Sequence, residues 1–438
     1  MFDTLKLLQS DAILGIMTLF RADQDPRKVD LSIGVYQDES GLTPVLECVK
    51  RAEREIIEEQ DSKTYVAIAG NSGFNSGVEN LLFGPNHPAL AAGRVATVQT
   101  PGGSGAISVL GHVVQRAKPN TRVYLSDPSW PNHLPLLRTA GLQLEQYPYY
   151  DYDVHRIDFE ALVDAVEHMH AGDIVLLHGC CHNPCGADLS EDQWNVLAEL
   201  CNRTGVLPFI DSAYQGLAEG LDQDAYGLRV MAERVPELLI TTSCSKNFGL
   251  YRERVGAACV VSATREQRDS VFSNLSNVAR SIYSMPPDHG AIVVSHILNT
   301  PELREEWFVE LSGMRERLKE MRALLGAALR DNAPDHDFSH IERARGMFSF
   351  VGISSEQVDR IKSEFAAYMV NSSRINIAGI SERNLDYLTD AVRAVGAAPS
   401  SSPVPLVPAT SITGADTLPR AKTRSDSRSI WSSSRARC

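Results

Sequence analysis

The chain has 438 residues, of which 43% are hydrophobic, and its formal net charge is −13 at pH 7. This length is enough for a large core and one smaller satellite domain, and the negative charge argues against nucleic acid as a partner of the folded part. The sequence has no run of about eighteen apolar residues, so we expect no membrane-spanning segment.

The N-terminal segment places apolar residues at roughly helical spacing, but it contains Asp3 and Asp11 and no arginine before Arg21. Such a segment is unlike a secretory signal or an organellar transit peptide. The 8 cysteines are scattered through the chain and do not resemble a disulfide framework, so reduced thiols are the simpler interpretation. We therefore expect a cytoplasmic protein.

Strand-like apolar runs alternate with stretches of helical periodicity through the middle of the chain. The expected strands are 122–125, 173–177, 205–210, 238–241 and 257–261, and a helix is expected at 193–203. A glycine-rich turn at 102–105 precedes an apolar, helix-compatible segment. This alternation predicts a mostly parallel sheet with helices on both faces.

A long, charged helical pattern follows at 301–331, and it should link the large domain to a smaller C-terminal one. Its apolar positions have heptad-like spacing, at Leu303, Trp307, Leu311, Met314, Leu318, Met321 and Leu325. After about residue 399 the composition changes to Ser, Pro, Thr and Arg. Such a tail buries too little surface to offset its ordering entropy, so we expect it to be disordered. Its arginines could dock on an anionic partner, although a solvated extension without a role is the simpler interpretation.

The segment TTSCSKNFGLYRERVGA, from Thr241, places one lysine among hydroxyls and an arginine. Ser243, Ser245 and Arg254 offer the donors that suit a phosphate dianion. Cationic and polar neighbours can disfavour the ammonium form of Lys246, which frees its amine to form a Schiff base with an aldehyde. The ligand that is both aldehyde and phosphate is pyridoxal phosphate. Taken alone, the same letters more often mark a surface turn before a solvated helix.

Asp211 directly follows the apolar run 205–210 and so should lie at the carboxyl end of a strand, where open α/β sheets place ligands. A carboxylate beside the pyridine nitrogen of the cofactor keeps the ring protonated, which lets the ring accept electrons. An aspartate capping the next helix is the competing interpretation.

Nine motifs in a fixed order carry a resemblance that extends from the N-terminus to about Ala398. They are IGVYQDESGLTPVL from Ile33, QTPGGSGA from Gln99, SDPSWPNH from Ser126, HGCCHNPCG from His178, DSAYQG from Asp211, SKNFGLYRERVGA from Ser245, YSMPPDHGA from Tyr283, GMFSF from Gly346 and SSRINIAG from Ser372. In these motifs the chain resembles the aspartate aminotransferase subgroup of the fold-type I pyridoxal-phosphate enzymes.

The resemblance implies an α/β fold with two domains. The large domain should hold a mostly parallel, seven-stranded-type sheet covered by helices, and both chain ends should form a smaller α/β domain. The implied limits are 1–45 for the N-terminal segment of the small domain, 46–315 for the large domain, 316–398 for the small domain and 399–438 for the tail.

The resemblance also implies a set of site residues. Those expected to bind the cofactor are Lys246, Gly103, Ser104, Trp130, His133, Asn183, Asp211, Tyr214, Ser243, Ser245, Arg254 and Tyr65. Catalytic roles fall to Lys246, Asp211, Tyr214 and Trp130. His133 should orient Asp211, and Tyr65 should reach the cofactor of a neighbouring subunit, which implies a homodimer with shared active sites.

For the substrate, the resemblance implies that Arg374 holds the α-carboxylate with help from Asn183 and Gly34, and that Trp130 contributes. Arg280 should reach the distal carboxylate across the dimer interface. The implied reaction is transamination between L-aspartate and 2-oxoglutarate, giving oxaloacetate and L-glutamate. A broad-specificity aromatic amino acid aminotransferase is the alternative.

Three positions depart from the residues usual in this family. Cys185, Cys244 and Met285 stand where threonine, an aromatic residue and asparagine are common. None of them is a group that the reaction requires. They therefore leave the breadth of substrate specificity open, but they do not put the type of reaction in doubt.

A metal-binding module is the rival interpretation, because histidines and cysteines crowd into the motif HGCCHNPCG. Adjacent strand residues point to opposite faces, so Cys180 and Cys181 should not share an ion, and we expect no metal site. A non-enzymatic scaffold conflicts with the intact set Lys246, Asp211, Tyr214, Arg254 and Arg374.

Overall fold

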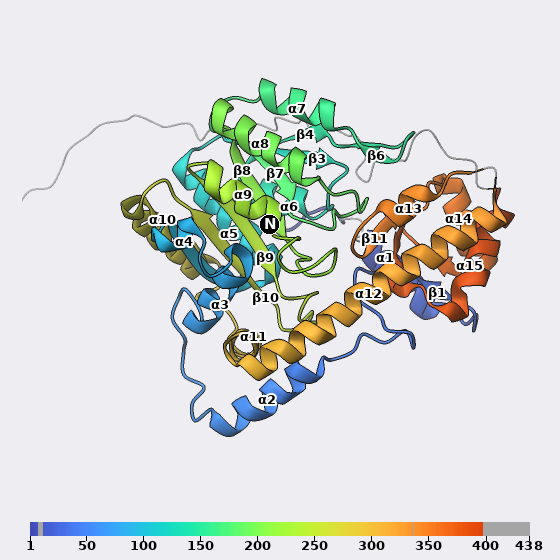
Figure 1. The fold of residues 1–438 in the computed structure, drawn as a ribbon, viewed down its shortest axis with the longest axis horizontal. Coiled ribbons are helices and arrows are strands. Elements are labelled where there is room, and N and C mark those ends of the chain that lie inside the picture. Colours follow the sequence, from blue (N-terminus) through green and yellow to red (C-terminus); the bar gives the residue numbers. More distant parts are fainter. Residues whose placement is uncertain (8–11, 335, 397–438) are drawn as a thin grey trace, which may run out of the picture. The chain divides into compact units, whose positions relative to one another are not determined.

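The computed structural model describes residues 1–7, 12–334 and 336–396, and its central element is a seven-stranded sheet (Figure 1). The strands of this sheet are β2 (Val95–Pro101), β3 (Arg122–Asp127), β4 (Gln143–Pro148), β7 (Ile174–His178), β8 (Leu207–Ser212), β9 (Leu238–Ser243) and β10 (Val255–Val261). Their order is β2-β10-β9-β8-β7-β3-β4. Strand β10 runs antiparallel to both neighbours, and the other pairings in the sheet are parallel. The predicted mostly parallel sheet is confirmed.

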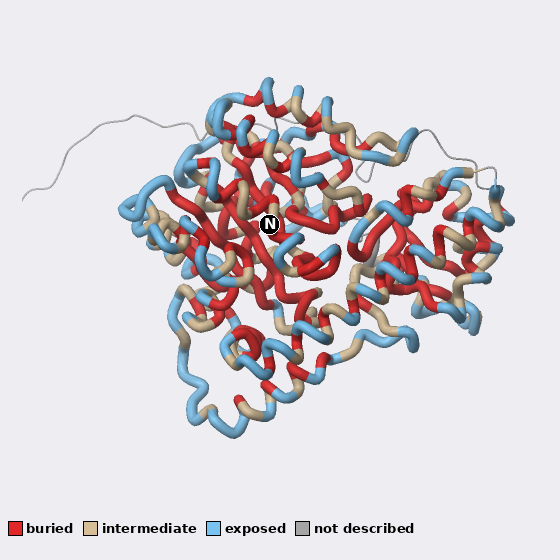
Figure 2. Tube along the Cα trace, in the orientation of Figure 1, coloured by how far each residue is buried: buried red, intermediate tan, exposed pale blue. Residues whose placement is uncertain are grey.

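The sheet is apolar on both faces, as the unbroken apolar runs of its strands require. Successive residues of a strand point to opposite faces. In β10, Ala257, Cys259 and Val261 accordingly join one core cluster. Ala258 and Val260 join the other. The buried residues in Figure 2 follow the strands for the same reason.

Helices cover each face of the sheet. The first face packs against α5 (Gly102–Ala117), α6 (His133–Thr139) and α10 (Arg265–Ile282). The second packs against α3 (Ser72–Phe83), α7 (Phe159–His168), α8 (Glu191–Thr204) and α9 (Tyr226–Arg234). The fold class expected from the sequence, α/β with helices on both faces, is confirmed.

Helix α8 shows how local sequence sets the ends of these elements. The Ser190 hydroxyl accepts the backbone N–H of Gln193, and the Gln193 side chain accepts the backbone N–H of Ser190, which is a capping box. Gly205 ends the helix with a φ of 72°, in the left-handed region that glycine adopts without strain. The predicted helix at 193–203 is therefore confirmed and extends slightly beyond those limits.

Helix α12 (Pro301–Asn332) is the long helix predicted from the heptad-like spacing, and all seven of its predicted apolar positions are buried. It contacts α2 (Glu47–Glu59) and α11 (His289–Asn299) near its start, and α13 (Ser339–Arg343) and α15 (Glu382–Ala394) near its end. Trp307 stacks on Phe248 with ring centroids 4.4 Å apart. Its indole N–H donates to the carbonyl oxygen of Asn247 at 2.8 Å.

Both chain ends contribute to the elements around the second half of α12. Strand β1 (Val29–Asp30) pairs in parallel with β12 (Ala367–Tyr368), and β11 (Phe348–Phe350) pairs antiparallel with β13 (Arg374–Asn376). The remaining elements are α1 (Ala12–Ala22), α4 (Pro88–Ala91), β5 (Tyr150–Asp151), β6 (Arg156–Ile157), α14 (Ser355–Phe365) and η1 (Ile377–Gly379).

The domain limits 1–45, 46–315 and 316–398 stay a prediction, and the boundary between 315 and 316 falls inside α12. The predicted tail, 399–438, lies outside the described residues. Among the helices that the structure describes, none has the length and apolarity needed to cross a membrane.

The packing of α12 predicts a clear stability difference between two adjacent residues. Trp307→Ala should lower the free energy of unfolding by about 3–5 kcal/mol, because it leaves a cavity against Phe248 and removes a hydrogen bond. The matched control Phe308→Ala, at a side chain that is 44% exposed, should cost about 1 kcal/mol or less. Urea unfolding measures the free energy of unfolding of both variants. Equal losses of stability would contradict the packing of Trp307.

Candidate active site

A cavity of about 220 Å³ lies at the carboxyl ends of the parallel strands β7, β8 and β9. It brings together most of the residues predicted for the site. These are Gly34, Gly103, Ser104, Trp130, Asn183, Asp211, Tyr214, Ser243, Ser245, Lys246 and Arg254. This is where the sequence placed them, because ligands of open α/β sheets bind at that edge.

One end of the cavity is built to hold an anion. The first turn of α5 follows β2 directly and points free N–H groups outward. Gly102 has a φ of +69°, and a Cβ there would lie 2.6 Å from Nη2 of Arg254, so glycine lets the guanidinium approach the turn. Arg254 Nη1 donates to the Ser245 hydroxyl at 3.3 Å, and the Ser243 hydroxyl donates to that of Ser245 at 3.1 Å. In the part of the chain that the structure describes, no carboxylate forms a salt bridge with Arg254, so this donor set suits a phosphate dianion.

Lys246 extends into the same cavity, with its Nζ atom 4.7 Å from the centroid of the Tyr214 ring. Burial lowers the pKa of the Lys246 ammonium to about 8, the nearby charge of Asp211 opposes this shift, and the charge of Arg254 adds to it. At pH 7 roughly a tenth of this side chain is then a neutral amine, compared with well under a thousandth for an ordinary lysine. A nucleophile or general base needs that form.

Asp211 is a buried carboxylate that stays ionised. Burial alone would raise its pKa, but hydrogen bonds and the nearby imidazoles outweigh burial, so the pKa of Asp211 is lowered below its usual value. His133 Nε2 lies 3.0 Å from Oδ2, and the Thr241 hydroxyl donates to Oδ1 at 2.8 Å. The carboxylate can thus stabilise a positive charge that a ligand brings into the cavity.

Two residues that line the cavity were missing from the predicted site. His178 is linked to His133 through the Ser129 hydroxyl, which lies 3.0 Å from His133 Nδ1 and 3.3 Å from His178 Nε2. Burial lowers the pKa of His178 to about 3, so its imidazole is neutral. Tyr251 accepts the backbone N–H of Tyr36 at 2.8 Å. His178 could have been identified from its position at the end of β7, because the register of the sheet places it directly opposite Asp211 on β8.

Arg374 is buried and does not itself line this cavity, but it contacts Asn183, which does. Its Nη2 donates to the carbonyl oxygen of Ser32 at 2.6 Å, and its Nη1 donates to Oδ1 of Asn183 at 3.3 Å. The guanidinium carbon is 4.5 Å from the centroid of the Phe348 ring. A Cβ on Gly34 would lie 2.9 Å from the same ring, so glycine allows the backbone to approach it. Arg374 and Asn183 together can hold a carboxylate.

Besides Arg374, three more predicted residues do not line the cavity. His133 is fully buried behind Asp211, consistent with an orienting role. Tyr65 is 87% exposed. Arg280 is exposed at the end of α10, where its Nη1 donates to the Ser284 hydroxyl at 2.5 Å. Within a single chain, Tyr65 and Arg280 therefore take no part in this cavity.

The sequence predicted that Cys180 and Cys181 are adjacent residues of a strand, and this prediction was wrong. Strand β7 ends at His178, so Cys180 and Cys181 are not strand neighbours, and Cys181 has a φ of +52° in a turn. The His178 and His182 rings stack at 4.0 Å, and Cys185 Sγ lies 3.1 Å from His182 Nδ1. Among the described residues, no group of three His, Cys, Asp or Glu side chains is arranged to hold a metal ion.

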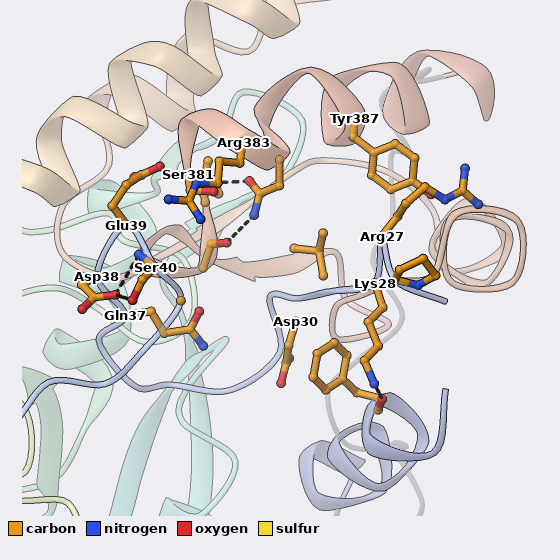
Figure 3. Close-up of a pocket in the computed structure, with 17 residues that line it drawn as sticks. Arg27, Lys28, Asp30, Gln37, Asp38, Glu39, Ser40, Ser381, Arg383 and Tyr387 are labelled. Atoms are coloured by element: carbon orange, nitrogen blue, oxygen red, sulfur yellow. Dashed lines mark hydrogen bonds between the residues drawn. The ribbon is translucent and has the colours of Figure 1, made fainter. Parts of the chain in front are cut away.

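A second cavity, of about 610 Å³, lies between the chain segments 20–41 and 379–387 (Figure 3). Charged side chains on its wall have partners of their own: Arg27 pairs with Asp25 at 2.8 Å, and the Ser40 hydroxyl donates to Asp38 at 2.6 Å. None of the residues predicted for the site lines this cavity. The smaller cavity around Lys246 is therefore the candidate active site.

Comparison with known proteins agrees with this geometry. The chain matches the family Aminotransferase class I and II over residues 26–392, and it therefore belongs to that family. It is 46% identical over 395 residues to the aspartate aminotransferase of Salmonella typhi, with 90% of this chain and 100% of the relative covered. It is 43% identical over 399 residues to the aromatic-amino-acid aminotransferase of Paracoccus denitrificans, with 90% and 100% covered.

A solved structure shows the same fold. The aromatic-amino-acid aminotransferase of Burkholderia pseudomallei, covalently bound to pyridoxal phosphate, superimposes with a TM-score of 0.88 at 40% identity. The alignment covers 90% of this chain and 99% of that one. The fold-type I architecture implied by the sequence motifs is confirmed.

The lowered pKa of Lys246 predicts how its amine responds to pH. In the cofactor-free protein, acylation of Lys246 by a trace of acetic anhydride should rise through a midpoint near pH 8, because only the neutral amine reacts. An ordinary lysine has its midpoint near pH 10.4, about two units higher. Peptide mass spectrometry after pulses at different pH measures the acylation of Lys246 and of the exposed lysines in the same sample. A Lys246 midpoint above pH 10 would contradict the burial of this amine.

Proposed function

We propose that the protein is a pyridoxal-phosphate-dependent aminotransferase that moves the amino group between L-aspartate and 2-oxoglutarate, giving oxaloacetate and L-glutamate. The observation that carries this proposal is that one cavity holds Lys246, whose pKa is lowered, together with the anion cradle formed by Ser243, Ser245 and Arg254 and with the ionised Asp211. The family match and the name of the Salmonella typhi relative support the same reaction.

The donor set of the cavity fits this cofactor. The first turn of α5, with Gly103 and Ser104, would hold the phosphate together with Ser243, Ser245 and Arg254. Asp211 would face the pyridine nitrogen, Trp130 the ring, and Asn183 and Tyr214 the phenolic oxygen. When bound, pyridoxal phosphate supplies an aldehyde that bonds an amine and a ring that accepts an electron pair.

The protein's own groups would then move one proton. In its neutral form, Lys246 is the general base that takes the proton from the α-carbon of the amino acid and later gives a proton back. Asp211 keeps its negative charge through this step, because His133 and Thr241 hold both of its oxygens. Tyr214, whose pKa burial raises, remains a neutral hydrogen-bond donor.

Two arginines would select the substrate. Arg374 with Asn183 would bind the α-carboxylate, and Arg280 of a second subunit would bind the distal carboxylate. A broad-specificity aromatic amino acid aminotransferase is the second candidate, because a relative with that name is nearly as similar as those named for aspartate.

The proposed assembly is a cytoplasmic homodimer with shared active sites. Tyr65 and Arg280 are exposed in the single chain, as expected for residues that complete the site of a neighbouring subunit. The cysteines that the structure describes are unpaired and buried, which fits a reducing compartment. The proposed partners are small amino acids and 2-oxo acids, and neither nucleic acid nor a membrane is needed for this function.

Replacing the distal-carboxylate arginine tests the substrate directly. Arg280→Asp should lower kcat/KM for aspartate by roughly two to three decades, because a desolvated arginine–carboxylate pair contributes on the order of 2–5 kcal/mol. Phenylalanine never forms that pair, so its kcat/KM should fall about tenfold or less. Steady-state assays with 2-oxoglutarate as acceptor measure both substrates. Equal losses for aspartate and phenylalanine would remove Arg280 from this role.

Mixing two inactive variants tests the shared sites. An Arg280→Asp subunit paired with a Lys246→Ala subunit forms a hybrid dimer in which one of the two sites keeps both residues. If exchange is statistical, half of the dimers are hybrids, and the mixture should recover up to about a quarter of the activity towards aspartate. Native mass spectrometry verifies that subunits exchange. No recovery in an exchanged sample would mean that each chain supplies its own arginine.

A further inference from the structure

Helix α12 carries a deeply buried cation outside the cavity, Arg322, which is 3% exposed. Its guanidinium donates five hydrogen bonds to carbonyl oxygens of a single segment, 341–348. Nη1 reaches Ile341 at 3.0 Å, and Nε reaches Gly346 at 3.2 Å. Nη2 reaches Gly346 at 2.8 Å, Arg345 at 3.1 Å and Phe348 at 2.5 Å.

The segment that Arg322 holds is pressed against the turn at 181–186. The backbone N–H of Arg345 donates to the carbonyl oxygen of Gly186 at 2.7 Å. Gly346 has a φ of +71°, and a Cβ there would overlap the side chain of Cys181. A Cβ on Gly186 would overlap the carbonyl oxygen of Phe348. Neither glycine leaves room for a side chain, so the two backbones touch.

A carboxylate holds the other side of the same turn. Partly buried Asp188 accepts the backbone N–H of Cys181 at 2.7 Å and that of His182 at 2.8 Å. Burial lowers the pKa of Arg322 to about 10, and the charge of Asp188 opposes that shift. Within the described residues, no carboxylate forms a salt bridge with Arg322.

These two backbones carry the groups proposed to bind the α-carboxylate. The turn at 181–186 presents Asn183, whose Oδ1 accepts a hydrogen bond from Arg374. The segment held by Arg322 ends in Phe348, whose ring lies under the Arg374 guanidinium and beside the Tyr214 ring, with centroids 6.0 Å apart. A shift of the segment would therefore move the support of Arg374 and the turn of Asn183 together.

We propose that Arg322 is a positioning residue for substrate recognition: by binding the carbonyl oxygens of 341–348, it holds Phe348 under Arg374 and keeps Asn183 in reach of the same carboxylate. This inference rests on the proposed function, since it assigns the support of that function's α-carboxylate site. Only arginine fits this role, because its planar fork offers five donors and a lysine ammonium offers three on one atom.

The test uses the holoenzyme with Arg322→Met, and Arg322→Lys as the milder variant. The matched control is Arg330→Met, on the same helix, which removes only an exposed ion pair with Glu342. Succinate is the probe, because it has two carboxylates but no amino or oxo group and so cannot react. Calorimetry gives its Kd, and the absorbance of the bound cofactor verifies that each variant is loaded.

Arg322→Met should raise the Kd of succinate and the KM of both aspartate and 2-oxoglutarate by roughly 10- to 100-fold, because displacement of a binding group by about 1 Å has effects of that size. Its kcat should change much less, since Lys246 and Asp211 lie on other segments. Arg322→Lys should show a smaller rise, and Arg330→Met none.

Binding to each loaded variant distinguishes positioning from stability. A lower melting temperature with a succinate Kd within about twofold of the wild type would overturn the proposal, because a residue that only stabilises the fold leaves the binding of the folded fraction unchanged. If Arg322→Met does not fold, an unchanged Kd in Arg322→Lys overturns it equally. If the wild type itself does not bind succinate, the proposed function is wrong, and this inference falls with it.

Discussion

The site depends on the burial of one amine. In water the side chain of Lys246 would be an inert ammonium, whereas in the cavity desolvation lowers its pKa to about 8. Burial of a cation is costly unless its surroundings compensate, and here ionised Asp211 lies near enough to oppose the shift without abolishing it. Arg254 acts in the opposite sense, and it also belongs to the anion cradle. Arg254 thus both belongs to the phosphate-binding groups and helps to keep the neighbouring amine reactive.

The sheet and α12 place these charges and the carboxylate site. Asp211 and Ser243 lie at the carboxyl ends of β8 and β9, so two strands suffice to bring the acid and the cradle together. Helix α12 fixes the rest by donating to backbone carbonyls. Trp307 holds the residue that follows Lys246, and Arg322 holds the segment that supports Arg374. One helix therefore supports both the chemical and the recognition half of the cavity.

Much of this could be predicted from the sequence, because its signals are local. The apolar runs predicted five strands of the large sheet, all except β2 and β4. The heptad-like spacing predicted α12, and helical periodicity predicted α8. The cavity gathers most of the predicted site residues. What the sequence missed depends on contacts between distant segments. His178 enters the site through the register of β7 against β8, and the turn at Cys181 has a positive φ that no strand pattern shows. The roles of Tyr65 and Arg280 depend on a second subunit, which one chain does not contain.

The central claim is that Lys246 is the amine that bonds the cofactor. Reduction of the purified holoenzyme with sodium borohydride fixes such a bond, and digestion followed by mass spectrometry locates it. We expect one pyridoxyl group per chain, on the peptide that contains Lys246, and loss of the visible absorbance band at the same time. A pyridoxyl group on another lysine, or none on a protein with full transaminase activity, would contradict it.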